Sequence, residues 1–274
     1  MKKVALITGG SNGIGKGIAY KLAEEGYDIA FTYASNLKAA EEVKAELEAR
    51  GSRAAFSQAD LREAAEAQKV VDWAHAEMGR IDAMIINAGL DGRHSVLTAV
   101  QRDYDDFFHM NLRASMMLCG AAARYMIKDK IKGNMIFITS SRGERAYADD
   151  FMYGMTKAAL KRACESIAID LSPYGIRANC VAPGATWTHA GAAHETLMDG
   201  GVPMGRIGTP EDTADLVAYL ISDKAFMIDG TQIRIDGGLI LSGLPEGWAE
   251  AKFLDPEWTK KNYNKFMEEY FPET

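Results

Sequence analysis

Residues 4–15 read Val-Ala-Leu-Ile-Thr-Gly-Gly-Ser-Asn-Gly-Ile-Gly, an apolar run that ends in a glycine-rich turn. The run Val4–Thr8 is typical of a buried strand, and a helical pattern over Ile14–Glu25 follows the turn at once. Glycines permit a tight turn, and the N-terminus of the helix offers N–H groups to an anion. A strand, a glycine turn and a helix in this order predict a site for the pyrophosphate of a dinucleotide. The expected contacts come from Gly9, Ser11, Asn12, Gly13, Ile14 and Gly15.

Short apolar runs and longer helical patterns alternate along the rest of the chain. Further strands are predicted at Asp28–Tyr33, Ala54–Gln58, Ala83–Asn87, Asn134–Thr139, Arg177–Ala182 and Gln232–Asp236. Further helices are predicted at Leu37–Arg50, Ala64–Met78, Tyr104–Ile127, Tyr153–Leu171 and Glu211–Ser222. Strands that are mostly apolar suit a parallel sheet covered on both faces. We therefore expect an α/β chain with a single doubly wound (Rossmann) domain, a seven-stranded parallel sheet over residues 1–240, and a C-terminal extension over residues 241–274.

Composition excludes several classes of protein. The 274 residues carry a formal net charge of −7, so overall charge does not favour nucleic acid or an anionic membrane as a partner. No apolar run approaches the length of a membrane span, and the apolar run at the N-terminus is too short for a signal peptide. Three cysteines far apart in the sequence suggest free thiols in a core. We expect a soluble cytoplasmic protein.

One Tyr in the chain has a Lys four residues later, namely Tyr153 with Lys157. On a helix this spacing places the phenol and the ammonium on one face, where the cation is expected to lower the pKa of the phenol. Ser140 ends a predicted strand 13 residues before the Tyr, and Ser141 is its nearest rival. A hydroxyl and a phenol together can bind the oxygen of a carbonyl that accepts hydride, and the phenol can supply its proton.

The end of the second strand bears on the choice of cofactor. A carboxylate there binds the ribose of NAD(H) and repels the 2′-phosphate of NADP(H). The sequence at this place is Tyr33-Ala34-Ser35-Asn36, without an acid and with two possible phosphate donors. This favours NADP(H), with Tyr33, Ser35 and Asn36 as cofactor contacts. In the alternative, Ser35 and Asn36 only cap the helix that follows, and the neutral Asn12 leaves the preference open.

Eight motifs in order make the chain resemble the short-chain dehydrogenase/reductase family over residues 1–240, in particular its ketoacyl-reductase-like and hydroxysteroid-dehydrogenase-like members. The motifs are Thr8-Gly9-x3-Gly13-Ile14-Gly15, Asp60-Leu61, Asn87-Ala88-Gly89, Asn111, Ser140, Tyr153-x3-Lys157, Pro183-Gly184-x3-Thr188 and Asp229-Gly230-Thr231-x4-Asp236-Gly237-Gly238.

The resemblance implies a role for each motif. Tyr153 would be the acid/base, Ser140 would polarise the substrate oxygen, Lys157 would bind the nicotinamide ribose, and Asn111 would hold a water in a proton relay. Helix packing is the alternative for Asn111. The cofactor would also meet Asp60 and Leu61 at the adenine, Asn87, Ala88 and Gly89 at the adenosine ribose, and Pro183, Gly184, Thr186 and Thr188 at the nicotinamide.

The substrate is the least determined feature. Residues 185–206 predict a lid with apolar side chains, which favours a bulky, apolar secondary alcohol or ketone such as a steroid, a bile-acid-like alcohol or a 3-oxoacyl thioester. Arg142, Arg145 and Arg93 offer partners for an acidic substrate, or they form ion pairs in solvated loops. A sugar or polyol is the alternative substrate, and a non-catalytic dinucleotide sensor is the alternative of another class. No metal is expected, although His189, His194 and Glu195 lie close in sequence.

The extension holds seven aromatic side chains, which is unusual for a disordered tail. Tyr263, Phe266, Met267 and Tyr270 fall on one helical face, so we expect the tail to pack on its own body or on a neighbouring subunit. The family resemblance implies a homotetramer or a homodimer.

Overall fold

The computed structural model describes residues 2–188 and 202–241, together with residues 264 and 268. In this part of the chain seven parallel strands form one sheet in the order β3-β2-β1-β4-β5-β6-β7. The strands are β1 Val4–Ile7, β2 Asp28–Tyr33, β3 Ala54–Gln58, β4 Ala83–Ile86, β5 Asn134–Ile138, β6 Arg177–Pro183 and β7 Gln232–Ile235. The predicted fold class is confirmed, and the strand boundaries agree to within one residue.

The main α-helices are α1 Gly13–Glu24, α2 Leu37–Ala49, α3 Glu66–Met78, α4 Gln101–Phe107, α5 Ala114–Lys128, α6 Phe151–Leu171 and α8 Pro210–Ile221. The prediction of one continuous helix over Tyr104–Ile127 is wrong in detail. The helix begins at Gln101, and the π-helix η1 Phe108–Arg113 separates α4 from α5. The wider π-helical turn contains Asn111, whose side chain is bound to the loop that follows β4. Such interruptions often accompany functional sites.

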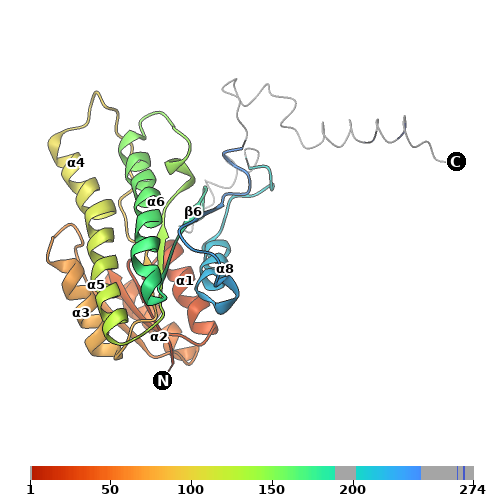
Figure 1. Cartoon of the computed structure of the whole chain (residues 1–274). Coiled ribbons are helices and arrows are strands. Elements are labelled where there is room, and N and C mark those ends of the chain that lie inside the picture. The colour runs from red at the N-terminus through yellow and green to blue at the C-terminus, as the bar shows by residue number, and fades with distance from the viewer. Residues whose placement is uncertain (1, 189–201, 242–263, 265–267, 269–274) are drawn as a thin grey trace.

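Two apolar cores hold the sheet between two helical layers (Figure 1). On one face Leu6 and Phe137 pack with α3, α5 and α6, and on the other Ile7 and Phe31 pack with α1, α2 and α8. Successive residues of a strand point to opposite faces, so a strand covered on both sides must be apolar throughout. This explains the continuous apolar runs seen in the sequence.

The strand order reverses between β1 and β4, which pair next to each other in the sheet. In an open parallel sheet, such a reversal leaves a crevice beyond the carboxyl ends of the strands. The glycine turn follows β1, Asn87 follows β4, Ser140 follows β5, and Gly184 follows β6. Chain order and sheet order together therefore bring four separate motifs to one edge.

The three cysteines Cys119, Cys164 and Cys180 are free and buried, as predicted. Burial raises the pKa of the Cys119 thiol to about 12, so this side chain is an inert part of the core. Within the described ranges, no helix has the length and apolar character needed to cross a membrane.

Candidate active site

The glycine turn after β1 has a backbone that other residues tolerate poorly. Gly9 and Gly13 have φ angles of 68° and 49°, in the left-handed region. A Cβ at Gly15 would lie 2.2 Å from the carbonyl oxygen of Gly9. Helix α1 begins after Asn12 without a side-chain cap and without an acidic residue in its first turn. Its N–H groups and the positive end of its dipole therefore suit the pyrophosphate of a dinucleotide.

Asn87 and Ala88 fix the shape of this turn. The Asn87 side-chain amide donates hydrogen bonds to the carbonyl oxygens of Thr8 and Gly9, at 2.9 and 3.3 Å. The backbone N–H groups of Asn87 and Ala88 both donate to the Thr8 hydroxyl, at 3.0 and 3.1 Å. The Asn87-Ala88-Gly89 segment thus lies directly against the glycine turn, where the sequence predicts a contact with the cofactor.

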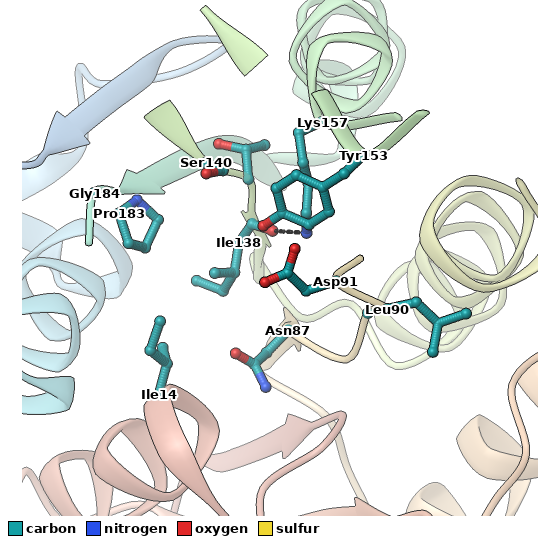
Figure 2. A pocket seen from close by; sticks show the side chains of 12 residues that line it. Ile14, Asn87, Leu90, Asp91, Ile138, Ser140, Tyr153, Lys157, Pro183 and Gly184 are labelled. Carbon is teal, nitrogen blue, oxygen red and sulfur yellow. Dashed lines mark hydrogen bonds between the residues drawn. The ribbon is translucent and has the colours of Figure 1, made fainter. Parts of the chain in front are cut away.

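A cavity of about 150 Å³ opens at the carboxyl ends of β1, β4, β5 and β6. Figure 2 shows the side chains of Ser140, Tyr153 and Lys157 converging on it from β5 and α6. Ser141 is buried and does not line the cavity, so Ser140 occupies the position that the sequence assigns to it. The lining consists of Ile14, Asn87, Gly89, Leu90, Asp91, Ile138, Thr139, Ser140, Tyr153, Lys157, Pro183 and Gly184.

Ser140 is oriented to donate its proton. Its Oγ accepts a hydrogen bond of 3.2 Å from the backbone N–H of Arg142. A hydroxyl that already accepts one hydrogen bond keeps its own proton for another partner. Hydrogen bonding from Ser140 lowers the pKa of Tyr153, so the two groups lie within reach of one substrate oxygen.

The expectation that Lys157 lowers the pKa of Tyr153 is not met. The net effect on the pKa of Tyr153 is upward from 10, because burial of the phenol outweighs the opposing effects of Ser140 and Arg142. The Lys157 Nζ lies 5.5 Å from the Tyr153 ring centroid and donates a hydrogen bond of 2.8 Å to the Ile138 carbonyl. Burial also lowers the pKa of Lys157 itself to about 8, although the charge of Asp91 opposes this shift.

Asn111 is 1% exposed and fully engaged. Its side chain accepts from the N–H of Leu90 at 2.7 Å, and donates to the Leu90 carbonyl at 3.0 Å and to the Thr156 hydroxyl at 3.1 Å. It therefore joins the π-helix to the loop after β4 and to the helix that carries Tyr153. The packing alternative describes these side-chain contacts well, and the water-relay role stays a prediction.

The end of β2 carries no carboxylate, as the sequence shows. Tyr33 is buried, whereas Ser35 and Asn36 are exposed. The Asn36 Oδ1 accepts a hydrogen bond of 3.0 Å from the N–H of Ala39, so Asn36 caps α2, which was the alternative role predicted for it. Of the two predicted phosphate donors, Ser35 is therefore the one that does not cap the helix through its side chain.

Of the two predicted adenine contacts, Asp60 is exposed and Leu61 is buried. Asp60 is exposed and pairs with Arg62 through two side-chain hydrogen bonds of 2.9 and 2.6 Å, which lowers the pKa of the carboxyl. Leu61 is 3% exposed and its side chain belongs to the core. Their contact with an adenine ring stays a prediction.

The segment after β6 closes the other side of the cavity. Gly184 packs so tightly that a Cβ would lie 2.6 Å from the Asp236 Cβ. Thr186 forms an isolated bridge with Gly208. Thr188 lies against the glycine turn, because a Cβ at Gly13 would be 3.3 Å from the Thr188 Cβ. Of the four predicted nicotinamide contacts, Pro183 and Gly184 line the cavity and Thr188 lies against the glycine turn, while the role of Thr186 stays a prediction.

In the charged loop after β5, Arg142 follows the ion-pair alternative predicted from the sequence. Arg142 is not available for a substrate carboxylate, because it donates to Asp91 at 2.8 Å and to the buried Asp150. Sequence reasoning missed both acids. They lie 51 residues before and 8 residues after Arg142, and no motif links them.

Two predicted features fall outside the described residues. One is the group His189, His194 and Glu195 in the predicted lid. The other is the predicted helical face of Tyr263, Phe266, Met267 and Tyr270 in the extension. Among the described residues, no group of His, Cys, Asp and Glu side chains could hold a metal ion.

Comparison with known proteins finds relatives over most of the chain. A family model described as Enoyl-(Acyl carrier protein) reductase matches residues 9–240. The chain is 32% identical to L-rhamnose 1-dehydrogenase (NAD(P)(+)) of Sphingomonas sp., over 88% of this chain and 97% of that one. It is also 32% identical to the 3-oxoacyl-[acyl-carrier-protein] reductase FabG of Staphylococcus epidermidis, over 88% of this chain and all of that one.

A solved structure with the same fold contains a nicotinamide cofactor. It is a short chain dehydrogenase from Burkholderia cenocepacia in complex with NADP, with a TM-score of 0.81 and 34% identity over 86% of this chain and 97% of that one. These relatives are oxidoreductases, and the fold of this chain agrees with that of the solved structure. The chain belongs to the short-chain dehydrogenase/reductase family, and it is an NAD(P)-dependent oxidoreductase.

Proposed function

We propose that this protein interconverts a secondary alcohol and a ketone with NADP(H), and that Tyr153 is its acid/base. The observation that carries the proposal is the convergence of Ser140, Tyr153 and Lys157 on one cavity bordered by the glycine turn and by Pro183-Gly184. A sensor would need the cofactor site but not this second set of groups, so the sensor alternative has no support.

The residues have separate tasks in ketone reduction. When bound in the cleft, a reduced nicotinamide would supply hydride for the carbonyl carbon. Ser140 donates a hydrogen bond to the carbonyl oxygen, where negative charge develops. Tyr153 gives its proton to that oxygen, which completes the alcohol and leaves a phenolate. Lys157 holds its ammonium beside the cavity, where it can bind ribose hydroxyls. Alcohol oxidation uses the same groups in reverse.

The NADP(H) preference rests on the end of β2. No acid stands at Tyr33-Ala34-Ser35-Asn36, so nothing in this segment repels a 2′-phosphate. The exposed Ser35 hydroxyl can donate to a phosphate, and the exposed Lys38 lies three residues later. A related structure in complex with NADP supports the same choice.

The first substrate class we propose is bulky and apolar, a steroid-like alcohol or a 3-oxoacyl thioester. The exposed apolar side chains Val96, Leu97 and Val100, in the loop that continues from Asp91, support it. So does the resemblance to a 3-oxoacyl-[acyl-carrier-protein] reductase.

A sugar or polyol is the second candidate, and one specific observation favours it. Asp91 lines the cavity with a side chain that is 70% exposed, and its carboxylate can accept hydrogen bonds from substrate hydroxyls. The resemblance to L-rhamnose 1-dehydrogenase agrees with this alternative.

A substrate panel separates the candidates. Initial rates of NADPH oxidation are measured with a 3-oxoacyl thioester, a 3-ketosteroid and an α-hydroxyketone, and rates of NADP⁺ reduction with a free aldose and a polyol. A higher kcat/KM for the first two supports the apolar class, and a higher value for the hydroxylated compounds supports the second. Absence of activity with every ketone, alcohol and aldose under both cofactors would overturn the proposed function.

Assembly, location and the extension are proposals as well. The family match ends at residue 240, which supports a catalytic domain over 1–240 and a separate extension over 241–274. We propose a cytoplasmic location and assembly into a homotetramer or homodimer. The exposed apolar side chains of Phe226 and Met227, which precede β7 in the chain, support the assembly. Truncation after Gly243 is expected to raise KM or to reduce the mass in sedimentation. Unchanged KM, mass and melting temperature would show that the extension has neither role.

A further inference from the structure

Arg142 lies on the face of the Tyr153 ring. Its guanidinium carbon is 4.4 Å from the ring centroid, whereas the Lys157 Nζ is 5.5 Å away. An arginine so close to an aromatic face interacts favourably with the ring, and a planar guanidinium can stack on it. The cation nearest to the ring of the proposed acid/base is therefore not the lysine of the motif.

Two carboxylates hold the guanidinium in this place. Asp91 accepts from it at 2.8 Å, and Asp150 accepts from the other terminal nitrogen. The Asp150 side chain is 3% exposed and stands at the N-cap of α6, three residues before Tyr153. A buried ion pair with a second hydrogen bond is restrained in its geometry, and removal of one partner leaves a buried charge. Arg142 thus joins the loop after β4, the loop after β5 and the helix that carries the phenol.

The charges around Tyr153 have opposing effects. Arg142 lowers the pKa of the phenol, while Asp91 and Asp150 raise it and Ser140 lowers it by hydrogen bonding. Lys157 faces the ring from α6 but is bound to the Ile138 carbonyl. The balance among these groups decides how readily the phenol loses its proton.

We propose that Arg142 is a positioning residue for Tyr153: it fixes the ring and stabilises the phenolate left after proton transfer, while Asp91 limits that stabilisation. The proposal rests on the proposed function, because it concerns the acid/base of that reaction. The distance of 4.4 Å between the guanidinium carbon and the ring centroid and the two carboxylate partners carry it, and the buried Asp150 restrains the arrangement. Neither the Tyr-x-x-x-Lys spacing nor the position of Ser140 implies such a residue.

The test measures the pH profile of kcat for alcohol oxidation in Arg142→Met, Arg142→Lys and Asp91→Asn. Methionine fills space without charge. In Arg142→Met the rise of kcat with pH should therefore move to higher pH, and kcat at pH 8 should fall about tenfold. Asp91→Asn removes a negative charge beside the phenol, so its rise moves to lower pH. Lysine keeps the charge without the planar fork, so Arg142→Lys returns the rise toward the wild-type position with a lower maximal rate.

Arg145→Met is the matched control. Arg145 lies on the same loop, 5.9 Å from the ring centroid of Tyr147, so this variant removes a similar pair away from Tyr153. Its profile is expected to match that of the wild type.

Three results would overturn the proposal. One is an unchanged profile in both Arg142→Met and Asp91→Asn, and another is a shift of both variants in the same direction. The third is a shift in Arg145→Met as large as that in Arg142→Met. If Arg142→Met does not fold, the direction of the Asp91→Asn shift still decides, together with an Arg142→Lys profile near the wild-type position but with a lower maximal rate. If the wild type is active and Tyr153→Phe is not, the proposed function stands even when the proposal for Arg142 is wrong.

Discussion

The ammonium of Lys157 donates a hydrogen bond of 2.8 Å to the carbonyl oxygen of Ile138, at the end of β5. The pairing connects α6 to the sheet at the base of the cavity (Figure 2). The residue is 5% exposed, so the cation is held in a site poor in water. Its pKa is accordingly lowered to about 8 from an ordinary 10.5.

This burial predicts a pH-dependent cost to stability. Below pH 8 the folded protein holds a buried charge that the unfolded chain solvates, and between pH 8 and 10.5 the unfolded chain binds more protons. The contribution of Lys157 to the free energy of unfolding therefore improves by about 2 kcal/mol from pH 7 to pH 9.5. Urea unfolding of wild type and Lys157→Met at both pH values checks it. Because methionine does not titrate, a difference between the two proteins that stays constant with pH would contradict the account.

The end of β2 predicts the cofactor response. Ser35→Asp places a carboxylate where the 2′-phosphate of NADPH is expected, so the dissociation constant for NADPH should rise about tenfold or more while that for NADH does not rise. Ser35→Asn is the matched neutral control and should leave the ratio near the wild-type value. Fluorescence titration with both cofactors measures the effect. A wild-type preference for NADH would overturn the assignment.

The glycine turn predicts a steric effect. Gly15→Ala brings a Cβ to within 2.2 Å of the Gly9 carbonyl oxygen, so the backbone must move. We expect a lower melting temperature and a rise of about tenfold or more in the dissociation constant for NADPH, because the phosphate site is displaced. Gly120→Ala in α5 is the control, since its Cβ would meet Arg124 at an ordinary 3.5 Å. That change should stabilise the helix by about 0.5–1 kcal/mol. Equal effects of the two substitutions would refute the steric argument.

Periodicity alone predicts most of the fold. Short apolar runs bounded by turn residues, such as β4 and β5, predict strands buried on both faces, so their boundaries follow from sequence. The π-helix at Phe108–Arg113 does not follow from it. The wider turn depends on hydrogen bonds between Asn111 and Leu90, a contact across 21 residues that no local pattern encodes.

The residues of the site also fall into those that the sequence predicts and those that it does not. Ser140, Tyr153 and Lys157 are predictable, because their spacing is set by one strand end and one helix. Asp91 is not, because its proximity to Arg142 arises only when the loop after β4 meets the loop after β5. Asp150 is not either, because the fold of the connection between β5 and α6 brings it back to Arg142 over eight residues, and no motif encodes that fold. The pKa of Tyr153 was predicted in the wrong direction for a related reason: spacing gives the neighbouring cation, but only the packed structure gives the burial that outweighs it.

The central claim is tested most directly by turnover of Tyr153→Phe with the best ketone of the panel and NADPH. The substitution removes one hydroxyl, and therefore the proton donor, while the ring, Arg142 and Lys157 remain. The account predicts a fall in kcat of about 100- to 10,000-fold with an unchanged dissociation constant for NADPH. Tyr147→Phe is the matched control. Tyr147 is an exposed tyrosine in the loop between β5 and α6, and its loss should leave turnover at the wild-type value. Near-normal kcat in Tyr153→Phe would contradict the claim that this phenol is the acid of the reaction.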